Sequence, residues 1–267
     1  MLTYTEYAYA ATNVQLQHSE GEEALLIPYT FKEAMALPAA ARWKAASYKE
    51  MRSLRAHKVN HRVSFTSIPT GPKAISSRWV YKIKADNSFK GCVVAEVWGQ
   101  VSGRDCGEMF ASFSRIQSIG MVLATAVKWW TVLHLDVQTA FRYADVEEKV
   151  WVKMALGYEA MDEATGTPLD VKLLKSFYGT KQSPKNWHGT IDTFLMGIGF
   201  KALKSDPCVY IFNGKITMKQ RLSAGDDSAV ILTVYVDDVL PAGGNTPTLE
   251  MIKGTLMNRS VQGVRHW

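Results

Sequence analysis

The chain has 267 residues, of which 47% are hydrophobic and 21% are charged. This composition excludes a largely disordered polymer, and the length allows one large domain or two small ones. The formal net charge of +6 fits a polyanionic partner such as nucleic acid, because neutralising phosphates releases counterions. Many soluble proteins without such a partner are equally basic, so charge alone does not select this class.

The cysteines and the apolar stretches indicate which cellular environment the protein suits. Cys92, Cys106 and Cys208 are widely spaced, which argues against a disulfide framework or a zinc finger. The N-terminus lacks the basic and apolar pattern of a signal peptide. The most apolar stretch, residues 119–135, is interrupted by a lysine and a histidine, so no membrane span is expected. We therefore expect an intracellular protein with no membrane partner; the sequence favours neither cytoplasm nor nucleus and no particular oligomeric state.

The first part of the chain predicts a linker, a helix and a hairpin, in that order. Residues 1–27 are polar and aperiodic, which is typical of a linker or a disordered end. A helical pattern extends over residues 30–57, and Pro38 within it suits a first-turn position. Two strands are expected near residues 74–83 and 91–98, joined as a hairpin by the Asp-Asn-Ser turn between them.

The second part predicts helices that alternate with short apolar strands. Apolar residues at helical spacing over 116–130 predict a helix, which leads into a strand over 131–135 that stops at Asp136. The Ser-Pro pair at 183–184 predicts an N-cap and first residue of a helix that ends near Gly197. The remaining expected elements are strands near 208–212 and 230–236, a hairpin turn at 213–214 and a helix from 246–247.

Two adjacent carboxylates interrupt an apolar, β-branched run at residues 231–240. Asp237 and Asp238 would be costly inside a buried strand, because unpaired buried carboxylates lose their hydration. A tight turn between two strands would instead present both at the end of a sheet, where cations can neutralise them. An ordinary Asp-Asp hairpin turn explains the same segment about equally well.

A third carboxylate, Asp136, follows a short apolar strand far earlier in the sequence. Only the fold could bring it to Asp237 and Asp238. Three carboxylates at the ends of neighbouring strands would hold two Mg²⁺ ions about 3.5–4 Å apart, since hard oxygen ligands suit Mg²⁺ better than zinc. The competing interpretation of Asp136 is a strand-end aspartate that caps the next turn.

An ordered series of motifs gives the chain a family resemblance. The motifs are Phe-Lys-Glu-Ala-Met at 31–35, Arg-Trp-Val-Tyr-Lys-Ile-Lys at 78–84, Leu-Asp-Val-Gln-Thr-Ala-Phe at 135–141, Tyr-Gly-Thr-Lys-Gln-Ser-Pro-Lys-Asn-Trp at 178–187, Asp-Pro-Cys-Val-Tyr at 206–210 and Tyr-Val-Asp-Asp at 235–238. A lone Tyr-Val-Asp-Asp is a weak signal, whereas this ordered set is specific. Over roughly residues 28–257 the chain resembles the reverse transcriptase of Ty1/copia-type LTR retrotransposons.

The resemblance implies an α+β fold. It would comprise the fingers and palm of a right-hand polymerase, with helices packed on an antiparallel palm sheet and a truncated or absent thumb, over residues 28–267. The implied activity is RNA-directed DNA polymerase: two Mg²⁺ ions support nucleotidyl transfer from a dNTP to a primer 3′-hydroxyl on an RNA or DNA template. The short C-terminus leads us to expect a fragment or decayed copy of a polyprotein.

The resemblance also implies roles at the acidic site. Asp136, Asp237 and Asp238 match the metal-binding carboxylates, and Val137 would offer a metal its backbone carbonyl. Phe141 matches the steric gate, a bulky ring that leaves no room for a ribose 2′-hydroxyl. A core aromatic is the alternative interpretation of Phe141.

Three further positions are implied to bind the nucleotide. Gln182 matches a residue that contacts the incoming nucleotide, and its alternative is a surface glutamine before a helix cap. Lys82 and Lys84 lie on the fingers hairpin, where cations would meet the triphosphate. For these two lysines, a solvated strand face explains the pattern about equally well.

The chain departs from the family pattern at several positions. Cys92 stands where the family has an arginine expected to clamp the triphosphate, and a thiol lacks the bidentate, always-charged guanidinium. Residues 142–144 read Arg-Tyr-Ala where Leu-Asn-Gly is usual. Pro241 falls in the strand after the acidic turn, where it would remove a ladder donor. These changes support a second hypothesis, a catalytically decayed remnant that at most binds nucleic acid.

A second acidic tripeptide, Gly-Asp-Asp at 225–227, raises a third hypothesis. It resembles the metal motif of RNA-dependent RNA polymerases. A polar segment precedes it, whereas a buried metal motif should follow an apolar strand. A hairpin loop between two strands therefore explains it better.

Overall fold

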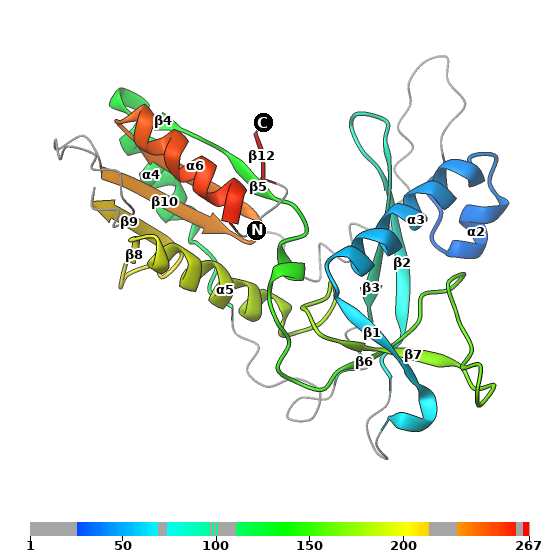
Figure 1. The fold of residues 1–267 in the computed structure, drawn as a ribbon. Helices are drawn as coiled ribbons and strands as arrows, with labels where there is room; N and C mark the ends of the chain where they lie inside the picture. Colours follow the sequence, from blue (N-terminus) through cyan, green and yellow to red (C-terminus); the bar gives the residue numbers. More distant parts are fainter. Residues whose placement is uncertain are drawn as a thin grey trace. The chain divides into compact units, whose positions relative to one another are not determined.

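The computed structural model describes residues 26–68, 74–96, 98, 100, 111–213, 229–259 and 264–266. The chain divides into two compact units, each built from two stretches of sequence (Figure 1). Unit 1 comprises Met1–Asp105 and Glu148–Thr180, and unit 2 comprises Cys106–Glu147 and Lys181–Trp267. Helices and antiparallel sheets occur in both, which confirms the predicted mixture of helix and sheet.

Some predicted features lie outside the described residues. These are residues 1–25 of the expected linker, Cys106, the glycine of the turn predicted at 213–214, and the Gly-Asp-Asp tripeptide at 225–227. Within the part of the chain that the structure does describe, no helix has both the length and the apolar character needed to cross a membrane.

Unit 1 combines two helices with two small antiparallel sheets in its described residues. In one sheet β7 lies between β1 and β6, and in the other β2 pairs with β3. The elements in chain order are α2 (Phe31–Ala36), α3 (Ala40–Ala56), β1 (Asn60–Ser64), η2 (Phe65–Ser67), β2 (Ser77–Ile83), β3 (Phe89–Ala95), β6 (Trp151–Lys153) and β7 (Leu169–Leu173).

The helix predicted over residues 30–57 is interrupted, so the prediction of one continuous helix was wrong. Thr30 caps α2, because its hydroxyl accepts a hydrogen bond of 3.1 Å from the Glu33 N–H. The chain then leaves the helix at Leu37, whose φ and ψ are −77° and 155°. A proline disfavours helical backbone in the residue before it, so Pro38 lies in the break and not in a first turn.

The hairpin predicted in the first part of the chain is confirmed as β2 and β3. Its inward face carries Trp79 and Tyr81, and the Tyr81 ring lies 5.1 Å from the ring of Trp43 in α3, centroid to centroid. The guanidinium of Arg42, also in α3, lies 4.0 Å above the centre of the Phe89 ring. Helix α3 therefore packs on the inward face of the hairpin, while Lys82 and Lys90 on the opposite face are exposed.

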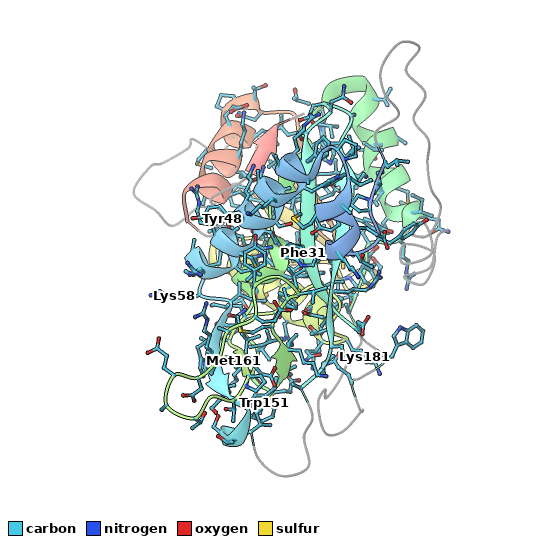
Figure 2. All side chains as sticks on the ribbon, turned by 90° about the vertical axis from the view of Figure 1, so that its right-hand side faces the viewer. Phe31, Tyr48, Lys58, Trp151, Met161 and Lys181 are labelled. Atoms are coloured by element: carbon cyan, nitrogen blue, oxygen red, sulfur yellow. The ribbon has the colours of Figure 1, made fainter. Side chains whose placement is uncertain are left out.

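In unit 1, aromatic rings pack around Phe31, which is labelled in Figure 2. The Phe31 ring lies 6.1 Å from the rings of both Trp79 and Tyr158, centroid to centroid. Gly157 has φ of 84°, and a Cβ on it would overlap the Phe31 ring. This position requires glycine because both the backbone conformation and the space exclude a side chain.

Unit 2 is built on one antiparallel sheet with the order β12-β5-β11-β10-β9-β8, and β4 pairs with β11 beside β5. Helix α5 runs alongside β9 and β10 (Figure 1). The elements are α4 (Ile116–Trp129), β4 (Thr131–Val132), β5 (Leu135–Val137), η4 (Ala140–Tyr143), α5 (Ser183–Gly197), β8 (Lys201–Ala202), β9 (Val209–Asn213), β10 (Ala229–Tyr235), β11 (Asp238–Gly243), α6 (Thr246–Arg259) and β12 (Val264–His266).

The two faces of this sheet have different environments, because alternate residues of a strand point to opposite sides. The back face is buried, and α5 covers it: the Tyr210 hydroxyl donates to Asp192 of α5 at 3.0 Å. Residues that share the back face by strand register are Leu135, Tyr210, Phe212, Leu232, Val234 and Val239, all buried. The sheet therefore forms its core against α5 and also against α6, whose Leu249 side chain lies beside Gly243 of β11.

Within the described part of the chain, helix α4 covers one end of the front face. There Ala242 packs against Val122 and Ala126 of α4. At the other end, beside the turn between β10 and β11, the register places Asp136, Tyr235 and Asp238 on this face, and His134 joins them through its contact with Asp238. All four keep some exposure to solvent. The front face is thus apolar under α4 and polar at the turn.

The Asp-Pro-Cys-Val-Tyr motif begins with a structural carboxylate. Asp206 is 3% exposed and accepts hydrogen bonds from the N–H groups of Arg115 and Cys208, at 3.0 and 3.1 Å. Burial raises the pKa of Asp206, but hydrogen bonds from Ser118, Arg115 and Cys208 outweigh burial and hold the pKa below its usual value. The ionised carboxylate lies at the N-terminus of α4, where the helix dipole favours a negative charge.

Candidate active site

The two acidic residues of Tyr-Val-Asp-Asp lie in a tight turn, as predicted. β10 and β11 pair in continuous register up to Tyr235 and Asp238, which leaves Val236 and Asp237 as the two turn residues. Val236 has φ of 57°, and Asp237 is not among the residues with positive φ. A positive φ at the first turn residue alone is typical of a type II′ hairpin turn, a position that favours glycine.

Asp136 lies directly opposite Asp238. The two residues are Cα partners in the antiparallel pairing of β5 and β11. Side chains of such partners project to the same face, with Cβ atoms about 4.5–5.5 Å apart. The fold therefore brings the distant aspartate to the acidic turn, and it does so through strand register.

The strand that carries Asp136 does not stop at this residue, so that prediction was wrong. β5 continues to Val137, because the Val137 N–H donates a hydrogen bond of 2.8 Å to the carbonyl of Asp237. This bond extends the ladder by one residue and attaches β5 to the turn itself. Asp237 is consequently tied to β5 through its backbone, while Asp136 and Asp238 are related through their side chains.

The donor set has the chemistry of a site for hard divalent cations. Asp136 and Asp238 offer carboxylate oxygens on one face, the ligands that Mg²⁺ prefers. Among the described residues, however, no three His, Cys, Asp or Glu side chains are grouped closely enough to hold a metal ion. The two facing carboxylates fit such a cation by the chemistry of their oxygen donors.

His134 is a neighbour of this site that sequence reasoning missed. Its Nε2 atom lies 2.7 Å from Oδ1 of Asp238, and the two side chains are 44% and 41% exposed. In the sequence, His134 stands out only as an interruption of an apolar stretch. The available signal was its spacing of two residues from Asp136, which places both on one face of a strand.

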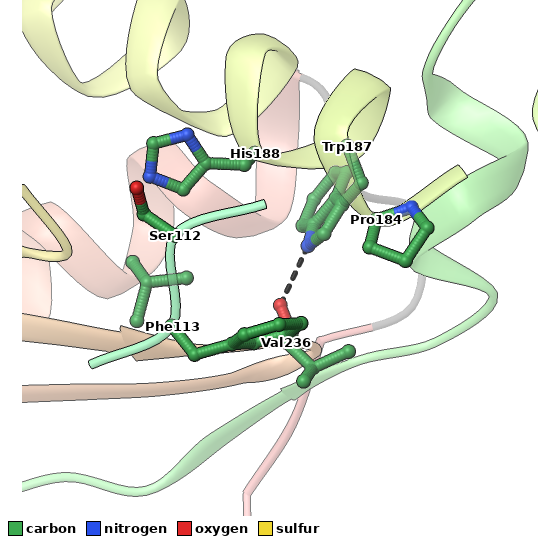
Figure 3. Close-up of a pocket in the computed structure, with 7 residues that line it drawn as sticks. Ser112, Phe113, Pro184, Trp187, His188 and Val236 are labelled. Carbon is green, nitrogen blue, oxygen red and sulfur yellow. Dashed lines mark hydrogen bonds between the residues drawn. The ribbon is translucent and has the colours of Figure 1, made fainter. Parts of the chain in front are cut away.

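Trp187 supports the acidic turn from behind. It is 3% exposed, and its Nε1–H donates a hydrogen bond of 2.5 Å to the carbonyl of Val236 (Figure 3). This bond lies beside a small pocket in unit 2. The pocket is lined by Ser112, Phe113, Pro184, Trp187, His188, Val234 and Val236.

Phe141 and Gln182 lie in η4 and at the start of α5, two elements that contact each other. Phe141 is 6% exposed, and this burial is what a core aromatic would show; its role as a steric gate stays a prediction. Gln182 is fully buried at the N-cap position of α5. The alternative of a surface glutamine was therefore wrong, and Ser183, predicted as the cap, is the first helical residue.

Lys82 and Lys84 belong to unit 1, on the β2–β3 hairpin. Lys82 is exposed and Lys84 is partly buried. The Cα partner of Lys82 is Lys90, a residue that sequence reasoning did not select and that only the hairpin register reveals. Two like charges directly opposite each other repel unless an anion lies between them. Cys92 follows Lys90 on the same face of β3, where it adds no charge.

Pro241 leaves the hairpin of the acidic turn intact. In a two-residue hairpin, bonded and non-bonded pairs alternate from the closing pair, so Pro241 and its partner Leu232 form a non-bonded pair. The missing N–H of Pro241 therefore points away from β10. On the other side, the Pro241 carbonyl accepts a 2.9 Å hydrogen bond from Leu133. The predicted loss of a ladder donor therefore affects the pairing of β11 with β4 and β5, which are separate strands on either side of this point.

Comparison with known proteins identifies relatives among retrotransposons. The chain is 31% identical over 235 residues to the retrovirus-related Pol polyprotein from transposon TNT 1-94 of Nicotiana tabacum, which covers 86% of this chain and 16% of that protein. The chain is 31% identical over 229 residues to the Pol polyprotein from transposon RE1 of Arabidopsis thaliana, a match that covers 82% of this chain and 14% of that protein. The chain is 22% identical over 172 residues to the transposon Ty1-MR1 Gag-Pol polyprotein of Saccharomyces cerevisiae, a match that covers 63% of this chain and 8% of that protein. The chain thus spans at most 16% of the length of these relatives.

A family match covers most of the chain. Residues 60–261 match the family described as reverse transcriptase (RNA-dependent DNA polymerase). This range contains Asp136 and the acidic turn, together with the strands that pair them. The chain therefore belongs to the reverse transcriptase (RNA-dependent DNA polymerase) family, as a reverse transcriptase domain of the copia type found in retrotransposon Pol polyproteins.

Proposed function

We propose that the chain acts as an RNA-directed DNA polymerase, extending a primer on an RNA or DNA template with dNTPs. Residues 28–267 would form its fingers and palm, with the sheet of unit 2 as the palm and the β2–β3 hairpin of unit 1 in the fingers. The observation that best supports this proposal is the register that makes Asp136 the partner of Asp238. Two carboxylates that face each other repel, and a divalent cation removes that repulsion.

The proposed metal ligands are Asp136, Asp237, Asp238 and the backbone carbonyl of Val137. Two bound Mg²⁺ ions would supply activation of the primer 3′-hydroxyl and neutralisation of the leaving pyrophosphate. Asp136 and Asp238 would hold their oxygens on the front face of the sheet, and the bond between Val137 and Asp237 would keep the turn beside β5. Each residue thus contributes by position and charge.

The nucleotide would contact four further residues. Lys82 and Lys84 would meet the triphosphate, and the cross-strand charge of Lys90 beside Lys82 strengthens this assignment. Phe141 would discriminate against a ribose 2′-hydroxyl, and Gln182 would contact the incoming nucleotide. The packing of η4 on α5 supports treating Phe141 and Gln182 as parts of one site.

A decayed remnant that binds nucleic acid without turnover is the second candidate. Cys92 supports it, because losing one charge-assisted contact to the triphosphate would cost on the order of 2–4 kcal/mol of transition-state stabilisation. The contact between His134 and Asp238 also supports it, since the imidazole occupies an oxygen that a metal would need.

Primer extension separates the two candidates. The purified chain would be given a labelled DNA primer on an RNA template, with dNTPs and either Mg²⁺ or a chelator. The proposal expects Mg²⁺-dependent extension that Asp237→Asn and Asp136→Asn abolish. Extension no greater than that of Asp237→Asn would refute polymerase activity, and salt-sensitive binding of the same duplex would then support the remnant.

A further inference from the structure

The acidic turn holds a residue that does not suit its backbone. Val236 occupies φ of 57°, and β-branched residues avoid left-handed backbone because Cβ crowds the neighbouring peptide. Glycine is the usual residue at the first position of a type II′ turn. Something outside the turn must therefore stabilise the conformation that Val236 adopts.

Trp187 makes the contact that can do this. Its indole is almost fully buried, and the Nε1–H donates to the Val236 carbonyl at 2.5 Å (Figure 3). A buried indole N–H and a turn carbonyl outside the strand ladder each need a partner, and here each satisfies the other. Trp187 lies in the first turns of α5, so the donor is fixed to a rigid element.

The acceptor is the atom that defines the type of turn. Rotating the peptide between Val236 and Asp237 converts a type II′ turn into type I′, in which Asp237 would also need positive φ. Asp237 is not among the residues with positive φ. A donor aimed at the Val236 carbonyl selects one orientation of this peptide, and the Val137 N–H holds the next carbonyl, that of Asp237.

We propose that Trp187 is a positioning residue for the metal ligands. Its indole N–H fixes the peptide between Val236 and Asp237 in the type II′ orientation, and this orientation sets the direction in which the Asp237 side chain leaves the backbone. The inference rests on the proposed function, in which Asp237 and Asp238 bind metal. It adds a residue from α5 that would act on the metal ligands through the backbone of the turn.

The test combines one donor deletion with one change that removes the strain. Trp187→Phe keeps a buried aromatic ring and deletes the N–H. Val236→Gly accepts the type II′ conformation without strain, so the turn no longer needs the donor. Binding of Mn²⁺, measured by electron paramagnetic resonance, reports on the ligands without requiring turnover.

Trp187→Phe should weaken Mn²⁺ binding about fivefold, the value of one hydrogen bond. In the Val236→Gly background the same substitution should change binding by less than about twofold. An equal loss in both backgrounds, or no loss in either, would overturn the proposal. Thermal unfolding of all four proteins identifies any loss that comes from unfolding.

A second measurement separates failure of this proposal from failure of the proposed function. The indole ¹H–¹⁵N resonance of Trp187, assigned by its loss in Trp187→Phe, should exchange slowly with solvent in the metal-free protein. Fast exchange would overturn the role of Trp187 whatever the metal does. Slow exchange in a protein that binds no more Mn²⁺ than Asp237→Asn would support the turn contact and refute the metal site.

Discussion

The Nε2 atom of His134 lies 2.7 Å from Oδ1 of Asp238, on the same sheet face as Asp136. The imidazole therefore contacts a carboxylate oxygen that the proposed metal site would use as a ligand. Both side chains are more than a third exposed, so solvent weakens the contact and a bound cation can displace it. His134 therefore competes with a cation for Asp238 in the proposed metal site.

Removing this competitor should strengthen metal binding. His134→Gln and His134→Ala are expected to lower the dissociation constant for Mn²⁺ by about two- to fivefold, the effect of losing an exposed contact of up to about 1 kcal/mol. Isothermal titration calorimetry would measure it. His61→Ala, at an exposed histidine in β1, serves as the control and should change nothing. Weaker Mn²⁺ binding in His134→Ala would instead make His134 a ligand.

Restoring a guanidinium in the hairpin should help nucleotide use. Cys92→Arg places a bidentate donor on the same face of β3 as Lys90. We expect kcat/KM for dNTP to rise by at least tenfold, because one such contact contributes on the order of 2–4 kcal/mol of transition-state stabilisation. Cys92→Ser is the matched control because it adds no charge. Equal values for the arginine and serine variants would show that the hairpin face does not meet the triphosphate.

Asp206 should contribute acid-sensitive stability. Because the pKa of Asp206 is lowered in the folded protein, its contribution is present above the unfolded value of about 3.9 and is lost as pH falls through the folded value. Asp206→Asn should lower the free energy of unfolding at pH 7 by about 1–2 kcal/mol. Urea unfolding should show this difference shrinking toward a pH of about 2.

The matched control for Asp206 is Glu163→Gln, a charge removal at an exposed loop position. It should leave the free energy of unfolding unchanged at both pH values. A difference between wild type and Asp206→Asn that grows as pH falls would contradict the assigned role of Asp206 at the start of α4.

Two glycines should respond oppositely to alanine. Gly179 has φ of 89°, and a Cβ there would overlap the backbone of Ala95, so Gly179→Ala should destabilise the fold by about 3 kcal/mol or more. Gly189 lies inside α5, and a Cβ added to it would meet nothing within 4 Å. Gly189→Ala should therefore stabilise by about 0.5–1 kcal/mol. Chemical denaturation measures both, and similar effects at the two positions would contradict these assignments.

Local features of the chain were predictable because short segments encode them. The β2–β3 hairpin, helix α4 and the turn at Val236 and Asp237 follow from turn residues and apolar periodicity. The break before Pro38 was missed, although the rule for residues before proline was sufficient to find it. The continuation of β5 past Asp136 was not predictable, since it depends on a hydrogen bond to a distant turn.

The family and the acidic turn could be recognised from the amino-acid sequence, because ordered motifs and an apolar run that two aspartates interrupt are properties of the chain alone. The folded structure was needed to show that Asp136 faces Asp238, that His134 contacts one oxygen of Asp238, and that Trp187 donates a hydrogen bond to Val236. The reason is register: a slip of one residue between distant strands would turn every side chain to the opposite face, and neither strand encodes its partner's alignment.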